Sequence, residues 1–286
     1  MFYERPQTIE DAVGMLARNV DNAFVLAGGT DLLVRMKRDD FDADLIVDIK
    51  AIRGMAEISE TDGMFIIGAA VPCAALGEHQ ALKAAWPGVV EAANLIGSTQ
   101  IQGRCTIAGN LCNASPAADS IPALVAAGAR AKIVGPDGSR TVAVEEIPVG
   151  PGKTSLKPGE LLEAIELPKP PPHSADAYLR FIPRTEMDIA VVGAAVNLTL
   201  DASGTVKSAR VALGAVAPTV VLAEAAAQAI IGTKLEDDAL DALAAACSAA
   251  CNPIDDKRGT TTFRKHVAGV LGKRAARNAY DRAGGA

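Results

Sequence analysis

The chain has 286 residues, of which 49% are hydrophobic and 22% charged, so it can bury a substantial core, and its length suits about two domains. Aromatic residues make up only 3% of the chain, and the net charge is −6. This composition argues against a base-stacking surface and a basic patch, and therefore against binding to nucleic acid or anionic lipid. A phosphate site in such a chain would have to use backbone amides and helix N-termini.

The five cysteines are an odd number and form no CxxC motif, which predicts reduced thiols and a cytoplasmic protein. Peripheral association with the inner face of the membrane is left open. The spacing offers no set of four cysteines for an iron–sulfur cluster, and no His/Cys pattern for a metal. No uninterrupted apolar segment reaches the roughly 18 residues that a membrane span requires.

The first 55 residues alternate between helix and strand signals. Thr8 with Asp11 three residues later is typical of a helix N-terminus. Strands are expected at 23–27 and 45–49, with a short helix beginning near Thr30 between them. The alternation predicts a small parallel sheet in a first lobe, residues 1–55.

A second lobe, residues 56–175, has a mixed α and β pattern. We expect a strand at 64–68, helices at 73–82, 89–96 and 121–127, and a hairpin of 131–134 with 141–144. The proline-rich stretch 167–173 predicts a stiff linker, so residues 1–175 form one expected domain and 176–286 another. The second domain should contain a hairpin of 194–200 with 206–213, followed by alanine-rich helices at 218–231, 237–250 and 261–280.

Two turns rich in small residues carry the strongest functional signal. The first, AGGTDLL at 27–33, follows a strand and precedes a helix, where glycine lets a phosphate approach the backbone closely. It is neither a GxGxxG fingerprint nor a P-loop, and alone it could be an ordinary strand–helix turn. The second, TIAGNLCNASPAADS at 106–120, offers the amides of Asn110 and Asn113 and the carboxylate of Asp119. Together the turns predict a dinucleotide held between two lobes.

The two turn sequences resemble those of the FAD-binding subunit of molybdenum hydroxylases, the medium subunit of the carbon monoxide dehydrogenase type, which is also a middle domain in xanthine dehydrogenase. Further similar motifs are Asp188-Ile189-Ala190 and the run 213–218, LGAVAP, so the resemblance covers nearly the whole chain. It implies an α+β fold. In such a fold, a two-lobed FAD-binding domain of the vanillyl-alcohol-oxidase/PCMH type precedes a C-terminal antiparallel sheet with a helix bundle.

The resemblance also implies cofactor-binding residues. The expected FAD contacts are Val25, Leu26, Ala27, Gly28, Gly29, Thr30, Asp31 and Leu32 around the diphosphate, Thr106, Ile107, Ala108, Gly109 and Asn110 in a second clamp, and Asp119, Leu161, Leu162 and Arg180. Leu162 or its neighbour Leu161 should pack on the isoalloxazine, and Arg180 should lie beside the flavin. Ala108 stands where the family more often has glycine. Neither turn contains a histidine for covalent attachment, so we expect FAD to be bound non-covalently.

The implied function is electron transfer, with no catalytic residue in this chain. A separate large subunit would hold molybdopterin and a small subunit two iron–sulfur clusters, in a dimer of heterotrimers. Electrons would pass from the clusters through FAD to an external acceptor. Two alternatives are a self-sufficient FAD-dependent oxidoreductase acting on a small molecule, and a non-enzymatic assembly protein that uses the fold as a scaffold. The sequence indicates neither the reducing substrate nor the acceptor.

Overall fold

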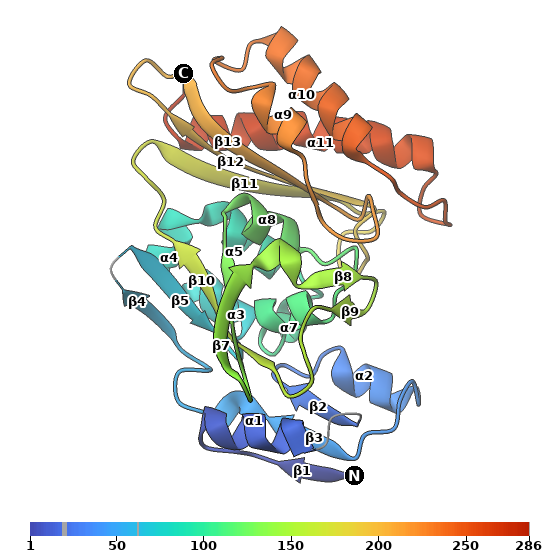
Figure 1. Ribbon diagram of the computed structural model, residues 1–286. Coiled ribbons are helices and arrows are strands. Elements are labelled where there is room, and N and C mark those ends of the chain that lie inside the picture. Colours follow the sequence, from blue (N-terminus) through green and yellow to red (C-terminus); the bar gives the residue numbers. More distant parts are fainter. Residues whose placement is uncertain (19–21, 62, 286) are drawn as a thin grey trace.

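The computed structural model describes residues 1–18, 22–61 and 63–285, and its elements follow one another along the long axis of the molecule (Figure 1). The first lobe contains β1 (Phe2–Glu4), α1 (Ile9–Arg18), β2 (Ala23–Leu26), α2 (Leu32–Lys37), β3 (Leu45–Asp48) and the 3-10 helix η1 (Ile49–Ala51). Its strands are parallel in the order β1-β3-β2, which confirms the predicted sheet. Thr8 accepts a hydrogen bond from the Asp11 amide at 3.2 Å and so caps α1, as its position predicts.

The second lobe is built on an antiparallel five-stranded sheet in the order β4-β5-β10-β6-β7. The strands are β4 (Ile58–Thr61), β5 (Met64–Gly68), β6 (Arg130–Gly135), β7 (Gly138–Ala143) and β10 (Leu161–Pro168), with β8 (Pro148–Gly150), β9 (Lys153–Thr154) and the 3-10 helix η2 (Val144–Glu146) beside them. The helices are α3 (Cys73–Glu78), α4 (Gln80–Ala85), α5 (Pro87–Asn94), α6 (Thr99–Gln102), α7 (Ile107–Cys112) and α8 (Ser120–Ala126).

Two expectations for this lobe are wrong in detail. The single helix expected at 73–82 is broken at His79, whose backbone is extended and whose Nδ1 accepts a hydrogen bond from the Leu82 amide at 3.1 Å. A side chain that caps a new helix in this way ends the preceding one. The expected linker also begins too early, because Leu167 and Pro168 pair with Phe65 and Met64 as the end of β10.

The C-terminal part contains an antiparallel sheet in the order β11-β12-β13-β14 and three helices. The elements are β11 (Ser174–Phe181), β12 (Val192–Leu200), β13 (Val206–Gly214), β14 (Val221–Leu222), α9 (Glu224–Gln228), α10 (Asp237–Ala250) and α11 (Thr261–Arg282). The helix expected at 218–231 is therefore wrong in its first half. Leu222 and Val221 instead pair with Ala212 and Leu213 of β13, since sheet hydrogen bonding there prevails over helix propensity.

This sheet is covered on both faces. Helices α9 to α11 lie on the side away from the first two lobes, and α5 and α8 lie on the other (Figure 1). Alternate residues divide between the two faces: Tyr178, Ala195 and Ala212 belong to the core of the first two lobes, whereas Val196 and Val211 belong to the C-terminal core. Because successive side chains of a strand point to opposite faces, one sheet serves two hydrophobic cores.

A buried carboxylate joins the two cores. Asp176 on β11 accepts hydrogen bonds from the amides of Gly88 and Val89, at 2.9 and 2.8 Å, at the start of α5. A Cβ at position 88 would come within 2.6 Å of the Asp176 carboxylate, so glycine permits this approach. The Trp86 indole donates to the Pro168 carbonyl at 2.7 Å and fixes the same corner. The position of the C-terminal sheet thus depends on local polar contacts as well as on apolar packing.

Candidate functional site

Both small-residue turns line one cavity between the first and second lobes, near α2 and α7 (Figure 1). The cavity has a volume of about 240 Å³ and is open to solvent at its mouth. The predicted residues that line it are Val25, Ala27, Gly28, Gly29, Thr30, Asp31, Leu32, Thr106, Ala108, Gly109, Asn110, Leu161 and Leu162. The structure therefore brings together turns that lie far apart in the sequence.

The two lobes meet directly at Gly28. A Cβ at this position would lie 2.1 Å from the carbonyl oxygen of Arg104 and 2.9 Å from the Cα of Cys105. Gly29 has a φ of 77°, which side-chain-bearing residues adopt rarely. Among the described residues, no acceptor receives the amides of Gly28, Gly29 or Thr30. The first turn thus combines close backbone contact with three unused donors beside the cavity.

A network below the first turn holds its backbone in place. The Lys50 ammonium donates to the Ala27 carbonyl at 3.0 Å and pairs with Asp48 at 2.7 Å. The Tyr3 hydroxyl donates to the other oxygen of Asp48. Burial acts to raise the pKa of Asp48, but the hydrogen bonds from Lys50 and Tyr3 outweigh it and hold this pKa below its usual value. The sequence analysis assigned no role to Tyr3 or Lys50, because nothing local links them to the turn.

The second turn is a short helix with a side-chain cap. Thr106 precedes α7, and its hydroxyl accepts a hydrogen bond from the Gly109 amide at 2.8 Å. The side-chain carbonyl oxygen of Asn110 accepts a hydrogen bond from the Ser120 hydroxyl at 2.7 Å, which ties α7 to the start of α8. Ala108, where the family more often has glycine, is buried and lines the cavity. These hydrogen bonds leave the side-chain NH₂ group of Asn110 available as a donor.

Four predicted residues do not line the cavity. Leu26 lies in β2, and Ile107 is buried in the core of the lobes. Asp119 and Arg180 pair with each other at 2.6 Å, and the Tyr178 hydroxyl donates to Asp119 at 3.0 Å. Their part in cofactor binding stays a prediction.

Burial has the largest effect on the pKa of the Asp119 carboxylate. It raises the pKa of Asp119 to about 6, although Arg180 and Tyr178 both act to lower it. The Nε–H of Arg180 is also buried and has no acceptor among the described residues. A buried donor without a partner is costly, so the guanidinium is suited to receive an acceptor atom from a bound group.

The cavity is also lined by residues outside the expected set of FAD contacts. They are Phe24, Arg35, Ile49, Ala69, Ile96, Cys105, Cys112, Asn113, Leu156 and Glu160. Arg35 is the cavity's one cationic lining residue in the part of the chain that the structure describes, and its guanidinium lies 5.0 Å from the Phe41 ring centre. It follows Asp31 by one helical turn, a spacing that could have signalled it. Glu160 is already paired with Arg140 at 2.8 Å.

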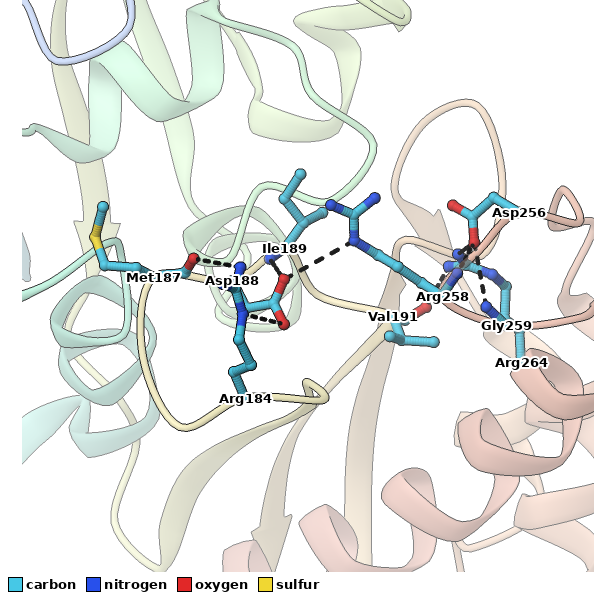
Figure 2. Close-up of polar contacts among 9 residues, drawn as sticks. All are labelled: Arg184, Met187, Asp188, Ile189, Val191, Asp256, Arg258, Gly259 and Arg264. Carbon is cyan, nitrogen blue, oxygen red and sulfur yellow. Dashed lines mark hydrogen bonds and ion pairs between the residues drawn. The ribbon is translucent and has the colours of Figure 1, made fainter.

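The motif residue Asp188 of the C-terminal part and the residues around it lie outside the cavity (Figure 2). Asp188 accepts from the Ile189 amide at 2.8 Å and lies 3.9 Å from the Arg258 guanidinium. The buried Arg264 donates to the Val191 carbonyl at 2.6 Å and pairs with Asp256 at 2.7 Å. None of these residues lines the cavity. They hold the loop between β11 and β12 against the loop before α11.

No helix described by the structure is long and apolar enough to cross a membrane. Likewise, residues 1–18, 22–61 and 63–285 contain no group of three or more His, Cys, Asp and Glu side chains that could hold a metal ion.

Comparison with known proteins agrees with this geometry. Residues 1–170 match the family described as FAD binding domain in molybdopterin dehydrogenase, and residues 177–279 match the CO dehydrogenase flavoprotein C-terminal domain. The carbon monoxide dehydrogenase medium chain of Afipia carboxidovorans is 36% identical, over 98% of this chain and 97% of its own length. The putative xanthine dehydrogenase FAD-binding subunit of Escherichia coli K12 is 32% identical, over 99% of this chain and 97% of its own length.

Solved structures show the same fold. CO dehydrogenase from Oligotropha carboxidovorans superimposes with a TM-score of 0.94 at 36% identity, over 98% of this chain and 97% of that one. Quinoline 2-oxidoreductase from Pseudomonas putida 86 gives 0.90 at 24% identity over the same shares, which shows the fold alone.

The matched families define a class of protein: an FAD-binding subunit of the molybdenum-containing oxidoreductases. Within that class, the chain belongs to the family of carbon monoxide dehydrogenase medium chains and xanthine dehydrogenase FAD-binding subunits. The resemblance carried by the two turns is therefore confirmed. The predicted order of a two-lobed FAD-binding region and a C-terminal antiparallel sheet with helices is also confirmed.

Proposed function

We propose that this chain is the medium subunit of a heterotrimeric molybdenum hydroxylase and passes electrons from a partner's iron–sulfur clusters through FAD to an external acceptor. The observation that carries the proposal is the convergence of both turns on one cavity, with backbone contact between the lobes at Gly28. FAD supplies the redox chemistry when bound, whereas the protein supplies position and electrostatics. The seventeen residues expected from the sequence remain the proposed binding set.

The polar end of the cavity fits a diphosphate. The unused amides of Gly28, Gly29 and Thr30 can each donate to a phosphate oxygen, and glycine lets such an anion approach the backbone. Arg35 adds one positive charge at the wall. This arrangement explains how a chain of net charge −6 can hold an anionic group without a basic patch. Thr106 and Lys50 act indirectly by holding the two turns in shape.

The apolar end fits a planar ring system. Leu161 and Leu162 on β10 and Ile96 line it, and they would exclude water from one face of an isoalloxazine. Arg180 and Asp119 do not line the cavity, but the free Nε–H of Arg180 keeps the pair in the proposed binding set. We propose that attachment is non-covalent.

The partners follow from the relatives. We propose a small subunit with two iron–sulfur clusters and a large subunit with molybdopterin, assembled as a dimer of heterotrimers in the cytoplasm. The domain boundary near residue 175 is likewise a proposal, supported by the C-terminal core, whose described residues all lie from Ala175 onward. Substrate oxidation would take place in the large subunit, so this chain's role is to accept electrons and release them.

The proposal is tested by purifying the chain natively and recording its flavin absorbance. We expect FAD to be bound and to pass into the supernatant on acid precipitation. When the chain is co-expressed with its partner subunits, the flavin should be bleached by the substrate of the complex. A chain that takes up no added FAD would contradict the proposal and favour the assembly-protein alternative. Turnover of a small donor by the isolated chain would favour the self-sufficient oxidoreductase.

A further inference from the structure

Two cysteines meet in the wall of the cavity. Cys73 begins α3 and Cys105 precedes the second turn, and the Cys73 amide donates to the Cys105 carbonyl at 2.8 Å. Each thiol lies close enough to the other to shift its pKa. Disulfides need Cα atoms about 4.4–6.8 Å apart, a separation that residues joined by a backbone hydrogen bond can provide. The two residues are therefore placed to be bridged without a large movement of the chain.

The pair is asymmetric in its access to the cavity. Cys105 lines the cavity, whereas Cys73 is not among the lining residues and is fully buried. The neighbouring Cys73 thiol lowers the pKa of the Cys105 thiol against the opposing effect of burial, and the Cys105 thiol raises the pKa of Cys73. Because the thiolate is the nucleophile, a small oxidant entering the cavity would react first at Cys105.

We propose that Cys73 and Cys105 form a peroxide-responsive thiol pair that closes to an intramolecular disulfide in the cavity wall. The oxidant is hydrogen peroxide. The Cys105 sulfur breaks the O–O bond and becomes a sulfenic acid, releasing one water after proton transfer. The Cys73 sulfur then displaces the sulfenic oxygen, which leaves as a second water. Overall, two thiols and one peroxide give one disulfide and two waters.

The bridge would form where the two lobes touch. Gly28 lies against the backbone of Arg104 and Cys105, so a disulfide at Cys105 would fix the surface on which the first turn rests. Formation of the disulfide should therefore slow the exchange of a ligand in the cavity. This consequence rests on the proposed function, whereas formation of the bridge does not.

The test uses the full chain freed of flavin, treated with hydrogen peroxide, alkylated under denaturing conditions and mapped by mass spectrometry. We expect two of the five thiols to be lost, a linked peptide containing Cys73 and Cys105, and full recovery with a reductant. The peptide map of the wild-type chain tests the proposal even if the variants fold poorly. Full alkylation of both thiols after peroxide treatment would overturn the proposal, as would a bridge from Cys105 to another cysteine.

Two variants make the test specific. In Cys73→Ser the sulfenic acid at Cys105 should persist, react with dimedone, and proceed to sulfinic acid because the resolving thiol is missing. Cys112→Ser is the matched control: Cys112 also lines the cavity, but burial raises its pKa to about 12, so its loss should leave the bridge unchanged. If Cys105 in the Cys73→Ser variant is oxidised no further than in the wild type, Cys73 is not the resolving thiol.

A last measurement distinguishes failure of the thiol pair from failure of the proposed function. FAD loaded before peroxide treatment should slow loss of the Cys105 thiol several-fold by filling the cavity. If the bridge forms equally fast with bound FAD, the thiol pair stands and the placement of FAD in this cavity fails. If FAD binds but no bridge forms in the flavin-free chain, the thiol pair fails and the proposed function stands.

Discussion

The cavity and the C-terminal loops use their polar groups in opposite ways. At the cavity, the first turn leaves the backbone donors of Gly28, Gly29 and Thr30 unused, beside open space. In the loops, Asp188 and Arg264 form hydrogen bonds and ion pairs within the chain (Figure 2). Polar groups in loops can thus serve binding or cohesion, and only their contacts distinguish the two. The predictions below separate cofactor affinity from stability on that basis.

The largest effect is expected from Gly28→Ala. Its Cβ would lie 2.1 Å from the Arg104 carbonyl oxygen, so the lobes would have to separate. We expect loss of FAD binding together with a loss of about 2–3 kcal/mol in the free energy of unfolding. Flavin absorbance and urea denaturation measure the two quantities. Gly150→Ala is the control, since no atom lies within 4 Å of its Cβ position, and it should change neither.

Arg264→Met should affect stability alone. The substitution removes the hydrogen bond to the Val191 carbonyl and leaves Asp256 without its partner. We expect the free energy of unfolding to fall by about 2 kcal/mol, because a charge-assisted network is lost from a buried position. FAD affinity, measured by fluorescence titration, should remain within two-fold of the wild type. A parallel loss of FAD affinity would show that these loops do take part in the cavity.

Asn110→Asp should affect affinity alone. Ser120 can still donate to the new carboxylate, so the fold should be preserved, but a negative charge would now face the diphosphate. We expect FAD binding to weaken by more than about 1 kcal/mol, with little change in melting temperature. Asn252→Asp adds the same charge at an exposed position away from the cavity and serves as control. Unchanged flavin occupancy in Asn110→Asp would mean that the second turn does not contact the cofactor.

The smallest effect concerns the junction of the two cores and its pH dependence. Burial raises the pKa of Asp176 to about 6, from an ordinary value of 3.8, although two amides and Arg282 oppose the shift. The folded chain then holds this proton more tightly than the unfolded chain, so the group's contribution to stability is full below about pH 4 and is lost as the pH rises through about 6.

Asp176→Asn should remove that contribution. We expect the slope of unfolding free energy against pH, between pH 4 and 6, to become more positive, because the variant side chain binds no proton in either state. The slope is the informative quantity, because the substitution also alters the hydrogen bonds to Gly88 and Val89 at every pH. Urea denaturation at several pH values measures it, and an unchanged slope would assign the pH dependence to other carboxylates.

Local signals found most of the elements and both turns. Small residues between a strand and a helix identified the first turn, and the small polar residues around Asn110 and Asn113 identified the second. The same reasoning failed where a contact distant in sequence decided the outcome. Leu222 joins a sheet instead of a helix because β13 is its neighbour. Cys105 escaped notice because only the folded chain places it at the cavity, whereas the spacing of Arg35 from Asp31 could have indicated Arg35.

The sequence by itself determined the family, the order of the elements and the two turns, because each depends on residues close together along the chain. The tertiary structure alone decided that Gly28 rests on Arg104 and Cys105, that Cys105 meets Cys73, and that one sheet serves two cores. Such contacts arise when packing brings distant segments together, and their geometry depends on every element between them. No periodicity or spacing in the sequence records that geometry.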